Sequence, residues 1–285
     1  MTATMAGPPV ILDGPVPEAP PFNILTVAEE GRRIGGDDGI ASRWLNGAQI
    51  WSYPSDAGEG IDPCETGTFR LKDEGGGTVN PLFGAFTGYL PDTCTAIAMD
   101  WEIFTQHANV VMDAITGSLL ERQLASAAFK VDNPYLGDAN AALPSGSTAT
   151  SAVRSLAILE EAIAATERGG VIHATPGTII AWASWNLIIR VGDHLETPGG
   201  TPVIRGTGYV DAFPINGVPA AGLNQQWAWA SGPIIYQAGP LVMTPDTIRE
   251  ALDRSINEVT YRAERALLVA WDTQLQVAIL VDRSL

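Results

Sequence analysis

Histidine is the side chain that most often moves protons near neutral pH, and this sequence contains three of them. His107 lies on a predicted helix beside its apolar stripe, His173 lies in a predicted strand, and His194 follows an aspartate in a predicted turn. None of the three is paired with another at the spacing of metal ligands. A packing or surface position is therefore the better interpretation of the first, and a structural role that of the other two.

Other motifs that support catalysis or cofactor binding are missing or incomplete. The sequence has no GxSxG elbow for a nucleophilic serine and no HExxH pair for zinc. Gly206-Thr207-Gly208 starts like a dinucleotide-binding loop, but Asp211 occupies the third glycine position. Residues 35–39 resemble a calcium loop in composition only, and the adjacent Glu160 and Glu161 are interpreted as a solvated helix edge. We therefore expect no enzyme activity, no cofactor and no metal site.

The charge balance argues against nucleic acid as a direct partner. The 285 residues carry 16 basic and 32 acidic side chains, a formal net charge of −16, and the isoelectric point is about 4.4. The only lysines are Lys72 and Lys130, so no basic stripe can neutralise phosphates and no sequence-specific binding of nucleic acid is expected. The charged share of 17% is below the usual figure of about 25%, which suggests that other protein covers part of the surface.

The sequence predicts neither a signal peptide nor contact with a membrane. The segment from Met1 to Ala19 lacks the basic cluster and the apolar run of a secretory signal. The longest apolar candidate for a span, Thr178–Val191, is interrupted by polar residues and is shorter than the roughly 20 residues that a bilayer requires. Cys64 and Cys94 lack a CxxC spacing, so free thiols are favoured, and a disulfide stays open only for an oxidising setting.

The first third of the chain is predicted to be extended. Residues 1–45 are rich in Pro, Gly and Asp without a sustained period, which predicts an arm that becomes ordered only against a neighbour. Residues 46–95 are dense in glycine, and the alternating pieces 49–53 and 68–72 predict the two limbs of a long β-hairpin. Because a two-stranded ribbon alone is marginal in water, this hairpin needs support from elsewhere.

Helical periodicity begins in the middle of the chain. We predict one helix from Thr105, as its N-cap, to about Phe129, and a second from about Ser151 to Arg168. The predicted apolar stripe of the first helix is Val110, Val111, Ala114, Ile115, Leu119, Ala125 and Phe129, with Asp113, Glu121 and Arg122 on other faces. The stripe of the second helix is Val153, Leu156, Ile158, Leu159 and Ile163.

Shorter elements follow from Val171 onward. Strands are predicted at 171–174, 187–191, 202–205, 226–230 and 233–237, and again at 258–267 and 269–281. Short helices are predicted from Thr175-Pro176 to about Trp185 and from Thr244-Pro245 to Arg254. Helices and antiparallel strands that are grouped rather than regularly alternating predict an α+β fold.

The order of these parts resembles the major capsid protein of tailed phages, whose fold is named after phage Hong Kong ninety-seven and is shared with bacterial encapsulins. The resemblance implies the following parts: an N-terminal arm (1–45), an extended hairpin or E-loop with its flanks (46–95), a P-domain with a long spine helix (96–147), a compact A-domain (148–243) and a return to the P-domain (244–285). Short runs are also similar to capsid-type proteins of actinobacteriophages, namely Gly170-Val171-Ile172-His173-Ala174, residues 197–203, residues 226–233, and Arg262-Ala263-Glu264-Arg265 with Trp271-Asp272.

The resemblance implies a structural protein that self-assembles into the icosahedral capsid shell around a phage genome. It places the chain in the virion capsid, assembled in the cytoplasm of the bacterial host. The partners would be copies of the chain in hexamers and pentamers, with a portal, a decoration protein and a separate scaffolding protein as further candidates. Another virion part, such as a neck or tail-tube protein, and an encapsulin-like compartment shell stay open as alternatives.

Contacts between subunits are expected at the hairpin. Trp51, Tyr53 and Phe69 have too few local partners to be buried within a ribbon, so we expect the hairpin to lie over a neighbour, with Trp51 and Phe69 as anchors. Arg70 and Lys72 would then meet carboxylates of that neighbour. Some capsid proteins crosslink such a lysine to an asparagine, but no catalytic glutamate can be identified here, so the crosslink is not expected.

Overall fold

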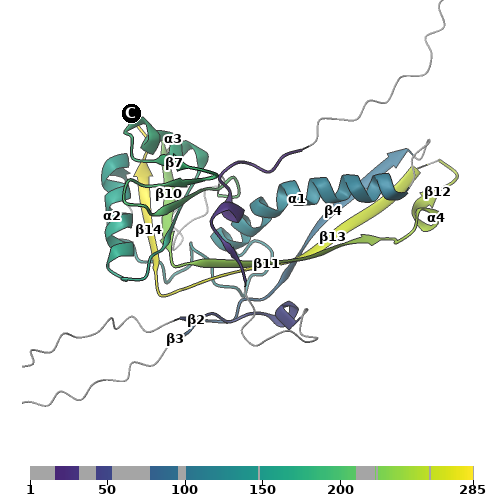
Figure 1. Cartoon of the computed structure of the whole chain (residues 1–285), viewed down its shortest axis with the longest axis horizontal. Coiled ribbons are helices and arrows are strands. Elements are labelled where there is room, and N and C mark those ends of the chain that lie inside the picture. Colours follow the sequence, from purple (N-terminus) through teal and green to yellow (C-terminus); the bar gives the residue numbers. More distant parts are fainter. Residues whose placement is uncertain are drawn as a thin grey trace, which may run out of the picture.

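The molecule is elongated, with a lobe at one end and a long strap that extends from it (Figure 1). The computed structural model describes residues 17–31, 43–52, 78–95, 101–146, 148–209, 222, 224–256 and 258–284. A seven-stranded sheet with two helices forms the lobe, and a five-stranded sheet with one long helix forms the strap. Two strands of the lobe lead almost directly into two strands of the strap, so the polypeptide itself joins the two parts.

The lobe sheet has the strand order β5-β14-β10-β6-β9-β8-β7. Its strands are β5 (Thr150–Ser151), β6 (Val171–Ala174), β7 (Ile189–Val191), β8 (His194–Glu196), β9 (Pro202–Arg205), β10 (Gln225–Ser231) and β14 (Gln276–Asp282). The central β10 pairs antiparallel with both β14 and β6. Because β5 and β7 stand at the two ends of this order, they are the edges of the lobe sheet.

Side chains of the lobe sheet alternate between two cores, because successive residues of a strand point to opposite faces. One face packs under α2 (Ala152–Ala164) and α3 (Pro176–Ser184). That core includes Ile172, Val203, Ala228 and Ile279. The other face, with Val171, Ile204, Trp227 and Leu280, packs against the strap and the C-terminal end of its long helix. The lobe sheet is therefore covered on both sides at its centre.

The strap is built around its longest strand, β13 (Glu258–Trp271). One edge of β13 pairs with β4 (Phe86–Thr95), and the other edge pairs with β11 (Ile234–Thr244) and the short β12 (Leu252–Asp253). The parallel β1 (Glu29–Glu30) continues the sheet beyond β11. The long helix α1 (Trp101–Ser126) lies along one face, where the ring of Phe104 packs against the ring of Tyr261.

The remaining elements are short. They are η1 (Ile24–Thr26), η2 (Arg43–Asn46), β2 (Trp51–Ser52), β3 (Thr78–Val79) and α4 (Ile248–Ala251). Asn23 begins η1, accepting a 2.8 Å hydrogen bond from Leu25 N, and Ile24 is fully buried. The prediction that residues 1–45 become ordered only against a neighbour is wrong for this part, because Ile24 enters the core of its own chain.

The spine helix exists as predicted but begins earlier and buries a different face. Thr105 lies inside α1, where its hydroxyl donates to Trp101 O over 2.9 Å, so it is not the N-cap. Phe129 lies beyond the helix and is exposed. The fully or nearly fully buried apolar residues are Phe104, Ala108, Met112, Leu120, Leu124 and Ala125, whereas the predicted Ile115 and Leu119 are only partly buried. Of the predicted stripe, Ala114 and Ala125 are buried. The lobe and η1 cover the end of α1 in addition to the strap sheet, so a pattern fitted to one covering layer identifies only part of the buried residues.

Other boundaries were predicted with mixed success. Strands at 171–174 and 202–205 and the start of α3 at Pro176 are confirmed. The predicted stripe of α2 is wrong at Val153, which is 48% exposed. The predicted helix after Thr244 begins only at Ile248, because Thr244 still pairs in β11.

Several strands were not predicted, among them β8 and β4, and one break between strands was misplaced. β8 was interpreted as a turn, and β4 was assigned to the flank of the hairpin although it pairs with β13 over its whole length. Gly88 in β4 weakens the strand pattern and packs closely on α1, since a Cβ there would lie 2.7 Å from Leu119 Cδ1. The final two strands were divided at Leu268, whereas β13 continues to Trp271 and β14 begins at Gln276.

Candidate functional site

The lobe and the strap meet where β10 leads into β11 and β13 leads into β14. We call Gly232-Pro233 and Asp272-Thr273-Gln274 the junction. Asp272 N donates to Pro233 O over 3.1 Å, and Gly232 N donates to Leu275 O over 3.3 Å. A Cβ on Gly232 would lie 2.6 Å from Asp272 O, so the two crossing segments approach as closely as only glycine permits.

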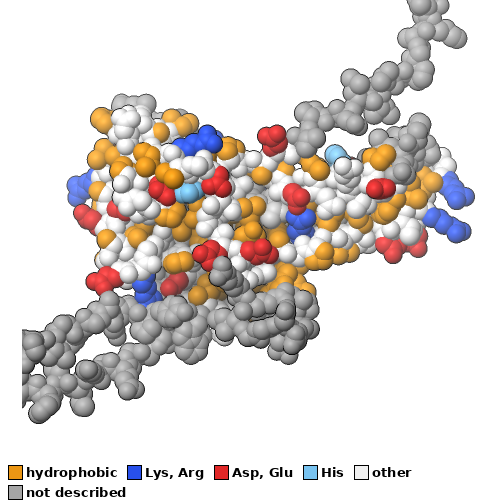
Figure 2. Space-filling model, viewed as in Figure 1, with side chains coloured by type: hydrophobic (Ala, Val, Ile, Leu, Met, Phe, Trp, Pro, Cys, Tyr) orange, Lys and Arg blue, Asp and Glu red, His pale blue; other side chains and the backbone are white. Residues whose placement is uncertain are grey.

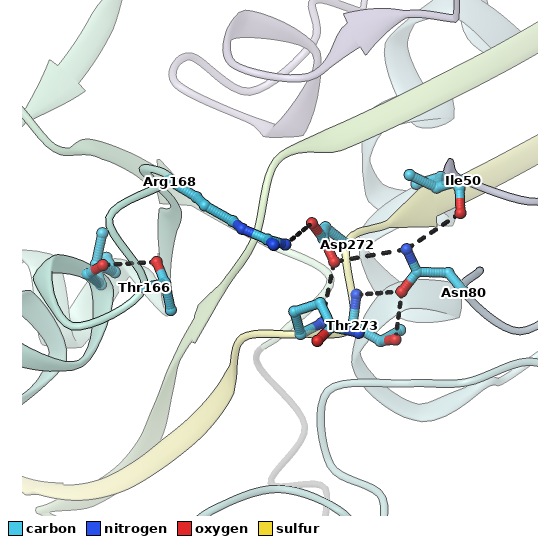
Figure 3. A network of polar contacts seen from close by, with 8 residues as sticks. Ile50, Asn80, Thr166, Arg168, Asp272 and Thr273 are labelled. Atoms are coloured by element: carbon cyan, nitrogen blue, oxygen red, sulfur yellow. Dashed lines mark hydrogen bonds and ion pairs between the residues drawn. The ribbon is translucent and has the colours of Figure 1, made fainter. Parts of the chain in front are cut away.

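The carboxylate of Asp272 is the centre of a polar network at the junction (Figure 3). Its Oδ1 accepts from Gln274 N over 3.0 Å and from Asn80 Nδ2 over 3.5 Å. Its Oδ2 lies 3.5 Å from Nη1 of Arg168, which follows α2, and both side chains are largely buried, at 12% and 17% exposed. The charge of Arg168 is therefore balanced by a residue of the junction, which ties the end of α2 to the point where the lobe meets the strap.

Asn80 connects the same network to the base of the predicted hairpin. Its backbone N–H and its Nδ2 both donate to Ile50 O, over 3.1 and 3.2 Å. Its Oδ1 accepts from Thr273 N over 2.9 Å and from the Thr273 hydroxyl. Next to these contacts, β2 and β3 pair antiparallel, with Trp51 opposite Val79 and Ser52 opposite Thr78. The two chain segments that lead to residues 53–77 are thus fixed to the junction.

A second buried polar chain lies in the lobe. His173 Nδ1 is 2.9 Å from Tyr209 Oη, and His173 Nε2 is 2.8 Å from Ser231 Oγ. Because Ser231 Oγ donates to Gly232 O, it accepts from Nε2–H, and Nδ1 then accepts from the tyrosine. Burial lowers the pKa of His173 to about 3, so the ring is neutral. All of these side chains are fully buried, so the serine and histidine pair stabilises the fold and is closed to a substrate.

Glu121 of α1 is buried and holds two distant segments. Its Oε1 accepts from Ile24 N over 3.1 Å, and its Oε2 accepts from Gly208 N over 2.8 Å. Burial raises the pKa of Glu121 to about 7, against the lowering effect of these backbone hydrogen bonds. Gly208 must be glycine, because a Cβ there would lie 2.6 Å from Glu121 Cβ. The sequence places Glu121 off the apolar stripe of its helix, yet the side chain is fully buried, and the run at 206–208 serves close packing on α1.

The other predicted chemical residues are dispersed. His107 is exposed on α1, and His194 begins β8 between the carboxylates of Asp193 and Glu196 at 3.1 and 2.8 Å. The hydrogen bonds that the carboxylate of Asp193, and then that of Glu196, accept from the ring raise the pKa of His194. Across the ranges that the structure describes, no cluster of three or more His, Cys, Asp or Glu side chains could hold a metal ion, and no helix is long and apolar enough to cross a membrane.

The predicted contact residues fall mostly outside the described part of the chain. Trp51 lies in β2 at the hairpin base. Tyr53, Phe69, Arg70 and Lys72 lie outside the described residues, as does Cys64.

One face of the strap sheet is left uncovered by α1. Residues that alternate outward on β4 and β13 lie there, such as Tyr89, which is 63% exposed, and its half-buried partner Glu264. A groove of about 600 Å³ lies on this face, lined among others by Trp44, Thr87 and Val242, with the carboxylates of Glu30 and Glu264 among its lining groups. We call this surface the open face of the strap.

Comparison with known proteins identifies the fold. No family model and no curated protein matches the sequence. A structure from Mycobacterium phage Bobi matches with a TM-score of 0.52 at 11% identity, over 98% of this chain and 95% of that one. Mycobacterium phage Che8 gives 0.51 at 9% identity over 99% of both chains, and Gordonia phage Cozz gives 0.50 at 10% identity over 98% and 91%.

These similarities, together with the arrangement of lobe, strap and hairpin base, establish the class. The chain has the α+β capsid fold of tailed phages that the sequence resemblance predicted. The matches cover nearly the whole of both chains.

Proposed function

We propose that this chain is the subunit of an icosahedral capsid shell that encloses a phage genome. The observation that supports this most strongly is the full-length similarity to three structures from phages, with 91% or more of each chain covered. The fold alone does not define a function. The surface adds an independent argument, because a shell subunit has to bury several of its sides against copies of itself.

The surface of the described residues fits such burial. Large apolar side chains are exposed on the lobe and on the strap, and charged side chains are sparse between them (Figure 2). The exposed apolar side chains include Tyr89, Val131, Ile180 and Val242, each more than half exposed. Exposed apolar surface spread over several elements is typical of a subunit with several interfaces rather than of a monomer.

We propose the open face of the strap as the receptor for the hairpin of a neighbouring copy. Glu30 and Glu264 supply carboxylates beside an apolar groove, which complements a segment that alternates apolar and basic residues, as Phe69-Arg70-Leu71-Lys72 does. In this arrangement Trp51 and Phe69 are the anchors, Tyr53 adds to the contact, and Arg70 and Lys72 pair with the carboxylates.

This contact between the hairpin and the open face of the strap is tested by removing its anchors. Trp51→Ala with Phe69→Ala should abolish shells while leaving subunits with near-native circular dichroism. The matched control, Trp185→Ala with Phe129→Ala, removes the same residue types from exposed positions just after α3 and after α1, and we expect its shells to persist. If the first variant still formed shells at normal protein and salt concentrations, the proposed contact of the hairpin with the open face would be refuted.

The shell itself is tested by electron microscopy and native mass spectrometry of the purified full-length chain. Closed shells, or pentamers and hexamers that await a separate scaffolding protein, would support the proposal. Stacked rings or tubes would instead support a neck or tail-tube protein. A monomer in both measurements would overturn every assembly role.

If the chain forms a shell, its role, its partners and its location follow. The role is structural rather than enzymatic, which the complete burial of His173 and Ser231 supports, because a substrate cannot reach them. The partners are copies of the chain in hexamers and pentamers, with a portal, and with decoration and scaffolding proteins as separate chains. The location is the virion capsid, after assembly in the cytoplasm of the host.

A further inference from the structure

The two edges of the lobe sheet differ in charge and both expose apolar side chains. β7 is one edge and β5 is the other, so they lie at opposite ends of the same sheet. An unpaired edge with apolar residues invites association with another chain, and soluble proteins usually protect such an edge. The composition of each edge indicates what would cover it.

The β7 edge presents an apolar and acidic face. Val191 pairs with His194 and Ile189 pairs with Glu196, so these four side chains share one face of the hairpin β7–β8. Leu195 points to the opposite face, into the core under α2 and α3. Ile189 and Val191 are 44% and 40% exposed, because the hairpin extends beyond the part of the sheet that the strap covers.

The charges on this face are predominantly negative. Glu196 lies beside Ile189, and Asp193 at the hairpin turn has a side chain that is 86% exposed. His194 lies between the two carboxylates. Arg190, the basic residue of β7, belongs to the other face, where its guanidinium lies 5.3 Å from the ring centre of Phe22. Hydrophobic, acidic and histidine side chains lie next to one another on the visible side of the lobe in Figure 2.

The β5 edge presents an apolar and basic corner. α2 begins directly after β5, and its first turn contains the exposed Val153 and Arg154 and no acidic residue. Within the described residues, Arg154 forms no hydrogen bond and no ion pair. The nearby Asp282, which pairs with Ser151 across β14 and β5, already accepts two hydrogen bonds from Ser284.

We propose that the β7–β8 face of one copy packs against the β5–α2 corner of the next copy, head to tail, so that the lobes form a closed ring. The apolar pair Ile189 and Val191 would meet Val153, and Asp193 would meet Arg154. Two different surfaces on opposite edges of one subunit generate a ring when the rotation between copies closes. Complementary charge fixes the register of such a contact and disfavours packing of like edges. This inference rests on the proposed shell and names the surfaces that join subunits within its pentamers and hexamers.

The test is a charge exchange in the full-length chain. Asp193→Arg and Arg154→Asp should each raise the protein concentration needed for rings and shells by about tenfold or more, because each places like charges in contact. The double variant, which restores an opposite pair in reversed orientation, should return assembly to near the wild-type concentration. Rings are measured by native mass spectrometry, shells by electron microscopy, and the fold of each variant by circular dichroism.

A matched control separates the specific pair from net charge. Asp193→Arg combined with Arg249→Asp, a reversal on α4 in the strap, has the same net charge as the exchanged pair and should not restore assembly. Normal assembly of both single variants, or equal rescue by the control, would overturn the ring contact while leaving the shell intact. Wild-type rings that never close into shells would overturn the shell and keep the ring contact, provided that the rings show the same charge dependence. A wild-type chain that forms neither would overturn both.

Discussion

Replacing Asp272 by alanine should destabilise the subunit more than any other single change at the junction. The substitution removes the group that faces Arg168 Nη1 at 3.5 Å and that accepts from Gln274 N at 3.0 Å. Arg168 is 17% exposed, and its Nε and Nη1 form no hydrogen bond with the described residues. Its charge would therefore stay largely buried without a partner.

The magnitude follows from these contacts. Breaking a buried ion pair by removing one partner costs about 3 to 5 kcal/mol, and one backbone hydrogen bond adds about 1 kcal/mol. The pair is long and retains some solvent contact, which places its share at the lower end. We expect a loss of about 3 to 4 kcal/mol in the free energy of unfolding.

Urea denaturation of dispersed subunits measures this loss. The matched control is Asp253→Ala, at the exposed end of β12. Like Asp272, Asp253 accepts from the backbone N–H two residues later, here that of Ser255, and it also accepts from the Ser255 hydroxyl. It forms no ion pair with an arginine among the described residues. Its midpoint should stay nearly unchanged. Adding Arg168→Met to Asp272→Ala should recover part of the loss, because the unpaired charge is then removed. If the double variant were as unstable as the two single losses added together, the stranded charge would not be the cause.

Three further predictions concern other parts of the fold. Burial raises the pKa of Glu121 from an ordinary 4.5 to about 7, so the folded state binds the extra proton between these values and stability should fall as pH rises from 4.5 to 7, by up to about 3 kcal/mol. Glu121→Gln should flatten this slope in urea titrations from pH 4 to 8, and an unchanged slope would contradict the burial argument. Leu120→Ala should cost about 2 to 5 kcal/mol by the same method, whereas Ile103→Ala, at a 47% exposed position of the same helix, should cost much less; equal midpoints would show that the wrong face has been identified as buried. Deleting residues before Asn23 should leave cooperative melting, because Ile24 and its bond to Glu121 are retained, and should weaken assembly; loss of the melting transition would place the deleted segment in the core.

The sequence predicts elements that depend on local chemistry. Pro176 starts α3 because its missing N–H and fixed φ suit a first helical turn. The run at 171–174 is bounded by glycine and by Thr175-Pro176, and the strand has the predicted ends. Each of these features is determined by residues that are neighbours in the sequence.

The candidate site could not be predicted, because its contacts join residues far apart in the chain. Glu121 receives hydrogen bonds from residues 97 and 87 positions away, and Asn80 contacts Thr273 across 193 positions. Nothing local distinguishes Glu121 from a solvated glutamate on a helix. The spacing of Gly206 and Gly208 was noticed, but only the structure shows that Gly208 leaves room for Glu121. Asp272 was noted only as part of a resemblance, without a role.

The junction interrupts both strand ladders at the same point. The pairing of β10 with β14 ends at Ser231 and Gln276, and that of β11 with β13 begins at Ile234 and Trp271. A change of angle between lobe and strap at this point therefore breaks no ladder hydrogen bond. In the proposed shell, copies in five-fold and six-fold surroundings would differ in local curvature, and this pivot would let one sequence adopt both. Since Asn80 fixes the hairpin base to Thr273, the direction of the hairpin would turn with the pivot, so that the curvature at one position would be communicated to the adjacent copy.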